Sequence, residues 1–266
     1  MASDEEDLSG HVLSERAAAH VLLIRFARDE KKNALHSSMI IELGRLLDAA
    51  AEDDTIRCVI LTGGIDAFAA GADIREMVAR GTAGTSNNPR RVAAWRRIEQ
   101  FRKPLIAAVN GIAFGAGNEL AMVCDFVIAG TNAMFGQPEV KIGGMAGDGG
   151  TQRLPRKVGA AFAAYMLFTG NPIDAETARQ LGYVVEICDP ADTVRRAVEV
   201  AALIATRAPI AVRLTKACIR VAVGATLENG IAYERDSIWR NAESPDRREG
   251  MTAFIEKRPP QFRGTW

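Results

Sequence analysis

Short apolar segments that alternate with glycine-containing turns and helical patterns are the feature that most constrains the fold. Ile56–Leu61, Leu105–Asn110 and Phe126–Ala129 are largely apolar runs whose length is typical of buried strands, and a glycine follows each of them. From Asp192 onward the pattern is helical almost throughout. Repeated strand–turn–helix units followed by helices predict an α/β layered domain with a C-terminal helical region.

The same patterns set the expected bounds of individual elements. Strands are predicted over His20–Phe26, Ile56–Leu61, Leu105–Asn110 and Phe126–Ala129, and helices over Ser37–Glu52, Ile74–Arg80 and Arg90–Lys103, with further helices from Asn118 and from near Thr151. The helix at Ser37 carries an apolar face of Met39, Leu43, Leu46, Leu47 and Ala50. Gly81–Pro89 is predicted to be a mobile polar loop.

Composition narrows the class of protein. The chain has 266 residues, which fits one large domain or a domain with a helical appendage. Lys plus Arg and Asp plus Glu both number 33, so no net charge favours nucleic acid or a membrane surface. No apolar run reaches the roughly 18–20 residues that a membrane-spanning helix needs.

The N-terminus and the cysteines bear on location. Residues 1–10 are acidic, unlike a secretory signal or a mitochondrial presequence, and we expect residues 1–12 to be disordered. The four cysteines are widely spaced and form no CxxC pair. Free buried thiols suit a reducing compartment, so the sequence predicts a cytoplasmic protein.

Residue types that are missing restrict the chemistry. The histidines are His11, His20 and His36, all near the N-terminus, and no serine occurs between Ser86 and Ser237. A Ser-His-Asp hydrolase and a His-rich metal site are therefore disfavoured. Carboxylates are left as the candidates for acid–base work in the middle of the chain.

The segment Gly115-Ala116-Gly117-Asn118-Glu119-Leu120 is a tight turn between a strand and a helix. It lacks the third glycine of a dinucleotide fingerprint, because Leu120 stands there. Such a turn can present backbone N–H groups to a developing negative charge, although a plain strand–helix turn is commoner. Glu119 could be a helix-start carboxylate and Glu139 a solvated loop residue. Two carboxylates beside such donors would also suit proton transfer at carbon.

Several segments together resemble the crotonase (enoyl-CoA hydratase/isomerase) family. They are Lys103–Gly111, Phe114–Ala121, Phe135–Glu139 and Gly149–Pro155, with further matches at Ala70–Ile74 and Asp246–Met251. The matches run in order, with ordinary spacing, from about residue 20 to about residue 260.

The resemblance implies a fold and an assembly. The expected fold is the crotonase (ClpP-like) α/β spiral of ββα units over residues 13–190. A C-terminal helical trimerisation region over residues 191–266 would build a homotrimer or homohexamer. The sequence motive for such contacts is an apolar stripe of Val194, Val198, Ala201 and Ala205, next to a helix around Ile210–Val223. The stripe must be buried, either within the subunit or between subunits.

The resemblance also implies a site for an acyl-coenzyme A thioester. Glu119 and Glu139 match the two catalytic glutamates of the hydratases, and the N–H groups of Ala72 and Ala116 match an oxyanion hole. Backbone at Gly115 and Gly147 would border the acyl group. Coenzyme A would pass the following residues: Lys31, Lys32, Ala70, Asp73, Ile74 and Arg75. Neither a metal nor another cofactor is expected, since coenzyme A is part of the substrate.

Departures from the family pattern keep other reactions open. Ala116 replaces a glycine, Asn118 stands where a small residue is common, and Met145-Ala146 replaces a frequent Ile-Pro pair. Asp148 stands where hydratases usually have alanine, and dienoyl-CoA isomerases carry an aspartate in a similar context. Asp148 is therefore a possible third acid, or else a residue that hydrogen-bonds the glycine-rich loop.

Hydration of a 2-enoyl-CoA is the preferred function, because both acids are glutamates. The enzyme alternative is an enoyl-CoA or dienoyl-CoA isomerase that uses Glu119, Glu139 and Asp148, and hydrolysis or retro-condensation stays open. The non-enzyme alternative is an acyl-CoA-binding or RNA-binding family member. It rests on a basic helix with these cations: Arg90, Arg91, Arg96, Arg97, Arg102 and Lys103. A solvated face is commoner for such a helix, so nucleic acid is not the expected partner.

Overall fold

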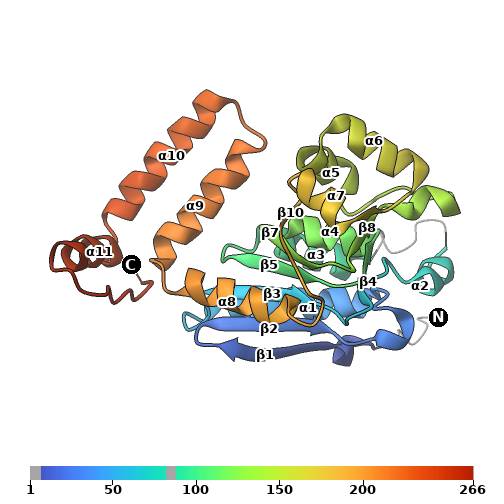
Figure 1. Ribbon diagram of the computed structural model, residues 1–266, viewed down its shortest axis with the longest axis horizontal. Coiled ribbons are helices and arrows are strands. Elements are labelled where there is room, and N and C mark those ends of the chain that lie inside the picture. Colours follow the sequence, from blue (N-terminus) through green and yellow to red (C-terminus); the bar gives the residue numbers. More distant parts are fainter. Residues whose placement is uncertain (1–6, 82–87, 266) are drawn as a thin grey trace.

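The computed structural model describes residues 7–81 and 88–265, and its strands form two sheets (Figure 1). The larger sheet has the order β1-β2-β3-β5-β7-β10, and these strands are Val12–Ala18, Val21–Phe26, Cys58–Thr62, Leu105–Val109, Phe126–Gly130 and Val184–Cys188. The smaller sheet has the order β4-β6-β8-β9, and these strands are Ala67–Ala69, Ile112–Phe114, Met134–Gly136 and Ile173–Asp174. Strand β1 pairs antiparallel with β2, β8 pairs antiparallel with β9, and the other neighbours are parallel.

Successive strands of the chain alternate between the two sheets. Strands β3, β5 and β7 lie in the larger sheet, and the strand that follows each of them lies in the smaller one. Helix α2 (Ile74–Ala79) follows β4, α4 (Ala116–Val123) follows β6, and the 3-10 helix η4 (Pro138–Ile142) follows β8. The chain thus winds through repeated ββα turns, which confirms the predicted α/β spiral.

Both faces of the larger sheet are covered. On β3, Cys58 and Ile60 point to one face and Val59 and Leu61 to the other, as the two-residue period of a strand requires. The first face meets α8 (Thr193–Ala205). The second face belongs to the main core, to which α1 (Ser37–Glu52), α3 (Pro89–Gln100) and α4 also contribute.

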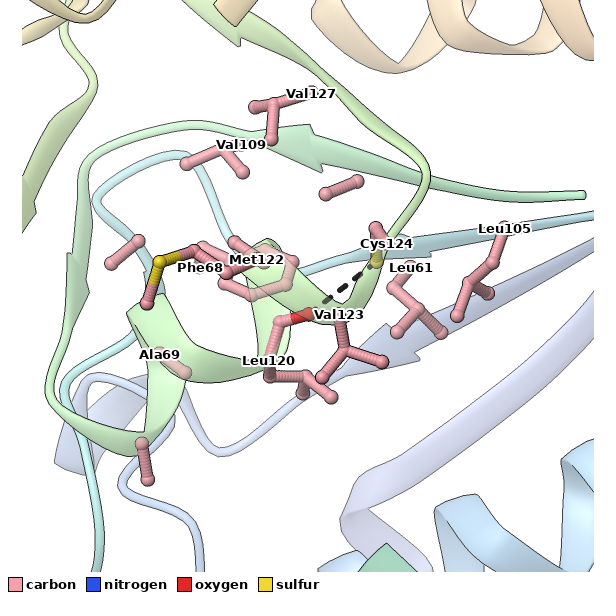
Figure 2. Close-up of a cluster of buried hydrophobic side chains, with 14 of the residues drawn as sticks. Leu61, Phe68, Ala69, Leu105, Val109, Leu120, Met122, Val123, Cys124 and Val127 are labelled. Atoms are coloured by element: carbon pink, nitrogen blue, oxygen red, sulfur yellow. Dashed lines mark hydrogen bonds between the residues drawn. The ribbon is translucent and has the colours of Figure 1, made fainter. Parts of the chain in front are cut away.

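Helix α4 is fixed in position by its apolar side. Figure 2 shows Leu120 and Val123 of α4, with Cys124 at its end, in one cluster with Leu61 and Leu105 of the larger sheet. The Cys124 thiol also lies 3.5 Å from the Leu120 carbonyl oxygen. Fully burying such side chains contributes about 1.5–3 kcal/mol each. The start of α4 therefore has a defined place beside the smaller sheet.

Three short helices lie between the glycine-rich segment, residues 143–149, and β10. They are α5 (Gly150–Val158), α6 (Ala160–Thr169) and α7 (Ala175–Gln180). Helix α5 packs against both α4 and α6. Its first residue, Gly150, thereby comes close to the start of α4.

The apolar stripe on α8 is buried within the subunit, which is one of the two arrangements that the sequence left open. Ala201 and Ala205, with Val194 and Val198 partly buried beside them, pack against the subunit's own sheet. The stripe therefore belongs to the core of this chain.

The helices beyond α8 project to one side of the sheets, at the left of Figure 1. They are α9 (Pro209–Ala222), α10 (Leu227–Ala242) and α11 (Pro245–Ile255). In the part of the chain that the structure describes, none of the helices is long and apolar enough to cross a membrane.

Near the N-terminus the structure corrects the expected disorder over residues 1–12. Residues 1–6 lie outside the described ranges, but Ser9–His11 forms a 3-10 helix (η1), Val12 begins β1 and Leu8 is buried. The Leu8 amide donates to the Ser38 hydroxyl at 3.0 Å, which ties this segment to α1. A second 3-10 helix, η2, spans Asp29–Lys31. Most of the predicted loop Gly81–Pro89 also lies outside the described ranges.

Candidate active site

Two loops of small residues meet at the start of α4. Gly115 has a φ of +51°, which favours glycine, and a Cβ on Gly117 would lie 2.2 Å from the Ala69 carbonyl oxygen. A Cβ on Gly71, whose φ is +114°, would lie 3.2 Å from the Phe114 carbonyl oxygen and 3.9 Å from the Ala116 nitrogen. The segment that carries Ala72 therefore adjoins the Ala116 amide. Among the described residues, neither the Ala72 nor the Ala116 amide donates to a protein acceptor.

Glu119 is buried in the first turn of α4, with 2% of its surface exposed. Its Oε1 accepts hydrogen bonds from the backbone N–H groups of Asp148, at 2.8 Å, and Gly150, at 2.6 Å. Burial, followed by the negative charges of Asp148 and Glu139, raises the pKa of Glu119 to about 7, although the two amides oppose this shift. A carboxyl with such a pKa can exchange a proton near neutral pH.

Glu139 lies in η4, close to the Ala116 turn. A Cβ on Gly115 would stand 3.2 Å from Glu139 Oε1, and the Gln137 side chain donates to the same oxygen at 3.2 Å. Glu139 Oε2 is buried, and no protein group within the described chain bonds to it. Burial and, to a lesser degree, the charge of Asp148 raise the pKa of Glu139. The protonated acid is therefore favoured relative to an exposed glutamate.

Glu119 and Glu139 are linked in space through the Gln137 side chain, which lies near Gly150. A Cβ on Gly150 would lie 2.6 Å from Gln137 Nε2 and 2.9 Å from Glu119 Oε1, and that Gln137 amide holds Glu139. The structure thus brings together the two carboxyls that the sequence singled out, at the turn that carries Ala116.

A buried chain of polar side chains, which sequence reasoning missed, orients Glu139. The Tyr183 hydroxyl donates to Asn118 Oδ1 at 2.6 Å, the Asn118 amide donates to Gln137 Oε1 at 2.9 Å, and Gln137 donates to Glu139. Asn118 was visible only as a departure from the family pattern. Tyr183 gave no local signal, because it reaches the site from the loop before β10.

Asp148, the possible third acid, is already paired. Both of its carboxylate oxygens accept from the guanidinium of Arg91, with 3.0 Å between Arg91 Nη1 and Asp148 Oδ1. Arg91 is 3% exposed and comes from α3, so it is a buried partner that sequence reasoning placed only in a basic helix. The Asp148 carboxylate is thus bonded to Arg91, close enough for its charge to act on Glu119, whereas its backbone amide contacts Glu119 directly.

The residues expected along coenzyme A also come together. The Ala70 amide donates to the Lys32 carbonyl at 2.9 Å, so the Lys31–Lys32 turn lies beside the segment that leads to Ala72. The Lys31, Lys32, Ile74 and Arg75 side chains are exposed. Gly147 is exposed as well, and a Cβ there would find open space.

Asp73 has a structural role that the sequence did not predict. Its carboxylate caps α2 by accepting from the amides of Arg75 and Glu76, and it pairs with buried Arg28 at 2.7 Å. Its side chain is thus fully engaged, and any contact with a ligand would involve its backbone.

The basic helix does not form a continuous cationic face. Arg91 and Lys103 are buried, and Arg97 pairs with Asp48 at 3.3 Å. The Lys103 ammonium donates to the carbonyl oxygens of Ala50 and Asp53. Internal pairing on this scale weighs against a nucleic-acid surface.

The arrangement can polarise a carbonyl oxygen at two backbone N–H groups and move protons with two carboxyls of raised pKa. Over residues 7–81 and 88–265, no cluster of three or more His, Cys, Asp or Glu side chains is placed to hold a metal ion.

Comparisons with known proteins agree with this geometry. A family model described as enoyl-CoA hydratase/isomerase matches residues 16–265. A 2,3-dehydroadipyl-CoA hydratase from Escherichia coli is 43% identical over 92% of this chain and 95% of its own length. A mitochondrial enoyl-CoA hydratase from Pongo abelii is 40% identical over 95% of this chain and 88% of its own. The crystal structure of an enoyl-CoA hydratase from Bacillus anthracis superposes with a TM-score of 0.89, at 36% identity, over 96% of this chain and 100% of that one. This chain belongs to the enoyl-CoA hydratase/isomerase family, within the crotonase superfamily.

Proposed function

We propose that this protein is an enoyl-CoA hydratase, which adds water across the α,β double bond of a 2-enoyl-CoA thioester. The observation that carries the proposal is the pair of carboxyls beside the Ala116 turn, buried Glu119 and half-buried Glu139. Relatives that match most of the chain are named as a 2,3-dehydroadipyl-CoA hydratase at 43% identity, an enoyl-CoA hydratase at 40% and a short-chain-enoyl-CoA hydratase at 39%. A hydro-lyase needs one group to take a proton from water and one to give a proton to carbon, and the two carboxyls supply both.

The proposed mechanism begins at the thioester carbonyl. Its oxygen would accept from the amides of Ala72 and Ala116, so that negative charge can develop there without reorganisation of the protein. One such donor typically lowers the barrier by about 3 kcal/mol. This polarisation makes Cβ electrophilic and lets Cα accept a proton.

The two glutamates would then divide the proton transfers. Ionised Glu119 takes a proton from water as the water oxygen bonds to Cβ, and protonated Glu139 gives its proton to Cα. Burial raises the pKa of both carboxyls, which allows one of them to hold a proton while the other is ionised. The Asp148 and Gly150 amides hold Glu119 Oε1, which leaves Oε2 as the oxygen to accept the proton from water.

Isomerisation of a dienoyl-CoA would need the third carboxylate as a proton carrier. The pairing of both Asp148 oxygens with Arg91 disfavours that use, because a carboxylate bonded at both oxygens to a buried guanidinium is held in place and is less free to carry a proton between carbons.

A panel of thioesters tests the proposal. Purified protein is incubated with short 2-enoyl-CoA, longer 2-enoyl-CoA and 3,5-dienoyl-CoA substrates, and the products are identified by mass. The expected product has gained one water. An unchanged mass with a shifted ultraviolet spectrum would instead establish isomerisation, and no reaction with any substrate would contradict both activities.

Three further properties are proposed with it. No metal or redox cofactor is required, because the carboxyls and amides supply every proton and charge that the addition needs. We propose a homotrimer or homohexamer. This assembly is supported by large exposed apolar side chains on the projecting helices: Leu227, Trp239, Phe254 and Ile255. A cytoplasmic location is supported by the four free cysteines, and cell fractionation would test it.

A further inference from the structure

Arg91 is a buried cation close to the proposed catalytic carboxyls, and the mechanism above does not use it. Its guanidinium binds both oxygens of Asp148, and it also lies over the Trp95 ring, 5.4 Å from the ring centre. The Asn88 side chain caps the start of α3 by accepting from the Arg91 amide at 3.3 Å. A planar guanidinium held in this way bonds to both oxygens of a carboxylate and so fixes the position and orientation of that carboxylate.

Asp148 in turn helps to fix the position of the Glu119 carboxyl. Its backbone N–H donates to Glu119 Oε1 at 2.8 Å, and the Gly150 amide joins it at 2.6 Å. A second bridge supports the same loop, because Arg153 donates to the Asp148 carbonyl oxygen and also binds Glu99 of α3. Helix α3 therefore holds the loop before α5 through two arginines, its own Arg91 and Arg153 of α5.

We propose that Arg91 is a positioning residue for Glu119, and that Asp148 serves as the counter-ion of Arg91 and as the carrier of the amide that orients Glu119. This inference rests on the proposed role of Glu119 in hydration. It assigns the aspartate that departs from the hydratase pattern to an ion pair with α3, and not to proton transfer.

The charges around Glu119 give the proposal a specific signature. The acids that face it are Asp148 and Glu139, and behind Asp148 lie Arg91 and Arg153. The negative charge of Asp148 raises the pKa of Glu119. Because Arg91 binds both oxygens of Asp148, we expect its positive charge to offset that effect. Loss of Arg91 alone should therefore move the Glu119 titration to higher pH, and loss of the Asp148 charge alone should move it to lower pH.

The test compares Arg91→Met, Asp148→Asn and the double variant by steady-state hydration of a short 2-enoyl-CoA between pH 5 and 9. The matched control is Arg45→Met, which removes an arginine from an exposed ion pair with Glu42 on α1. We expect Arg91→Met to lower kcat by at least about tenfold, with KM changed much less, because misplacing a reacting group by about 1 Å can cost a hundredfold.

The pH profiles distinguish a role of Arg91 in positioning Glu119 from a role in protein stability alone. The acid limb of kcat/KM should shift upward by at least about half a pH unit in Arg91→Met and downward in Asp148→Asn, with the double variant between them. The double variant should also be more active than Arg91→Met, since it no longer leaves a carboxylate unpaired beside Glu119. The control should match the unmodified protein.

Acid limbs that stay in place in both single variants would overturn the proposal, as would a double variant whose loss is the product of the two single losses. If Arg91→Met does not fold, Arg91→Lys, which keeps the charge but loses the bidentate geometry, should lower kcat with its acid limb unmoved, and Asp148→Asn should still move the acid limb downward. An acid limb that stays in place in Asp148→Asn, or a normal kcat in Arg91→Lys, would then overturn the proposal. A Glu119→Gln variant with normal turnover would instead overturn the proposed function, so the two failures are distinguishable.

Discussion

Glu119→Gln should make this protein less active and, above neutral pH, more stable. The side chain is buried, and its pKa of about 7 in the folded protein compares with an ordinary value of 4.5. The folded state therefore binds this proton more tightly than the unfolded state does. The resulting stabilisation is fully present below pH 4.5 and is lost as pH rises through about 7.

The size of the effect follows from the same two pKa values. The difference between the two pKa values corresponds to about 3 kcal/mol. Above pH 8, where Glu119 is ionised, the free energy of unfolding is lower by this amount than it is when Glu119 is protonated. Glutamine is neutral and nearly isosteric, and its Oε1 can still accept from the Asp148 and Gly150 amides. The variant should thus exceed the unmodified protein by up to about 3 kcal/mol at pH 8.5, roughly 6–12 °C in Tm, and should match it near pH 4.5.

Circular dichroism melts at both pH values, at one protein concentration, measure the stability, and loss of enone absorbance measures hydration. Turnover should fall by at least about a hundredfold, whereas binding of a coenzyme A thioester should survive. Glu15→Gln, on the exposed part of β1, is the matched control and should gain no stability with pH. A Glu119→Gln variant that is no more stable at pH 8.5 would refute the idea that the carboxylate is desolvated, and normal turnover would remove Glu119 from the mechanism.

Three further predictions concern other parts of the molecule. Glu139→Gln should cut turnover by at least about a hundredfold while a coenzyme A thioester still binds in a calorimetric titration, because no proton donor to Cα remains. Asp148→Ala should retain hydration within about tenfold. It should lower the free energy of unfolding, measured in urea, by about 3 kcal/mol, because it leaves buried Arg91 without its ion-pair partner. Complete loss of turnover in the folded variant would contradict this prediction. Light scattering at micromolar concentration should show a trimer or hexamer, and a stable monomer would disprove the oligomer.

Elements with strong periodicity could be predicted from the sequence. Helix α1 was predicted with its observed bounds, because an amphipathic stripe of sixteen residues leaves no ambiguity. Strands β4, β6 and β8 were missed, since three residues are too few to display a period. Strand β1 was missed for another reason. It reads as polar because most of its side chains face solvent, and pairing with β2 along one edge defines it.

The site divides in the same way between local and distant information. Glu119, Glu139 and the turn at Ala116 could be singled out because each lies within a short segment that a resemblance can match. Arg91 and Asp148 are 57 residues apart, and each alone reads as a solvated charge. Only the packing of α3 against the loop before α5 turns them into a pair, and that pair decides what Asp148 can do. An aspartate without protein partners could have reached the substrate, whereas this one is fixed at both oxygens by a buried guanidinium. The reaction that this carboxylate can serve is therefore set by a helix far from it in the sequence, and its local motif is not sufficient to assign it.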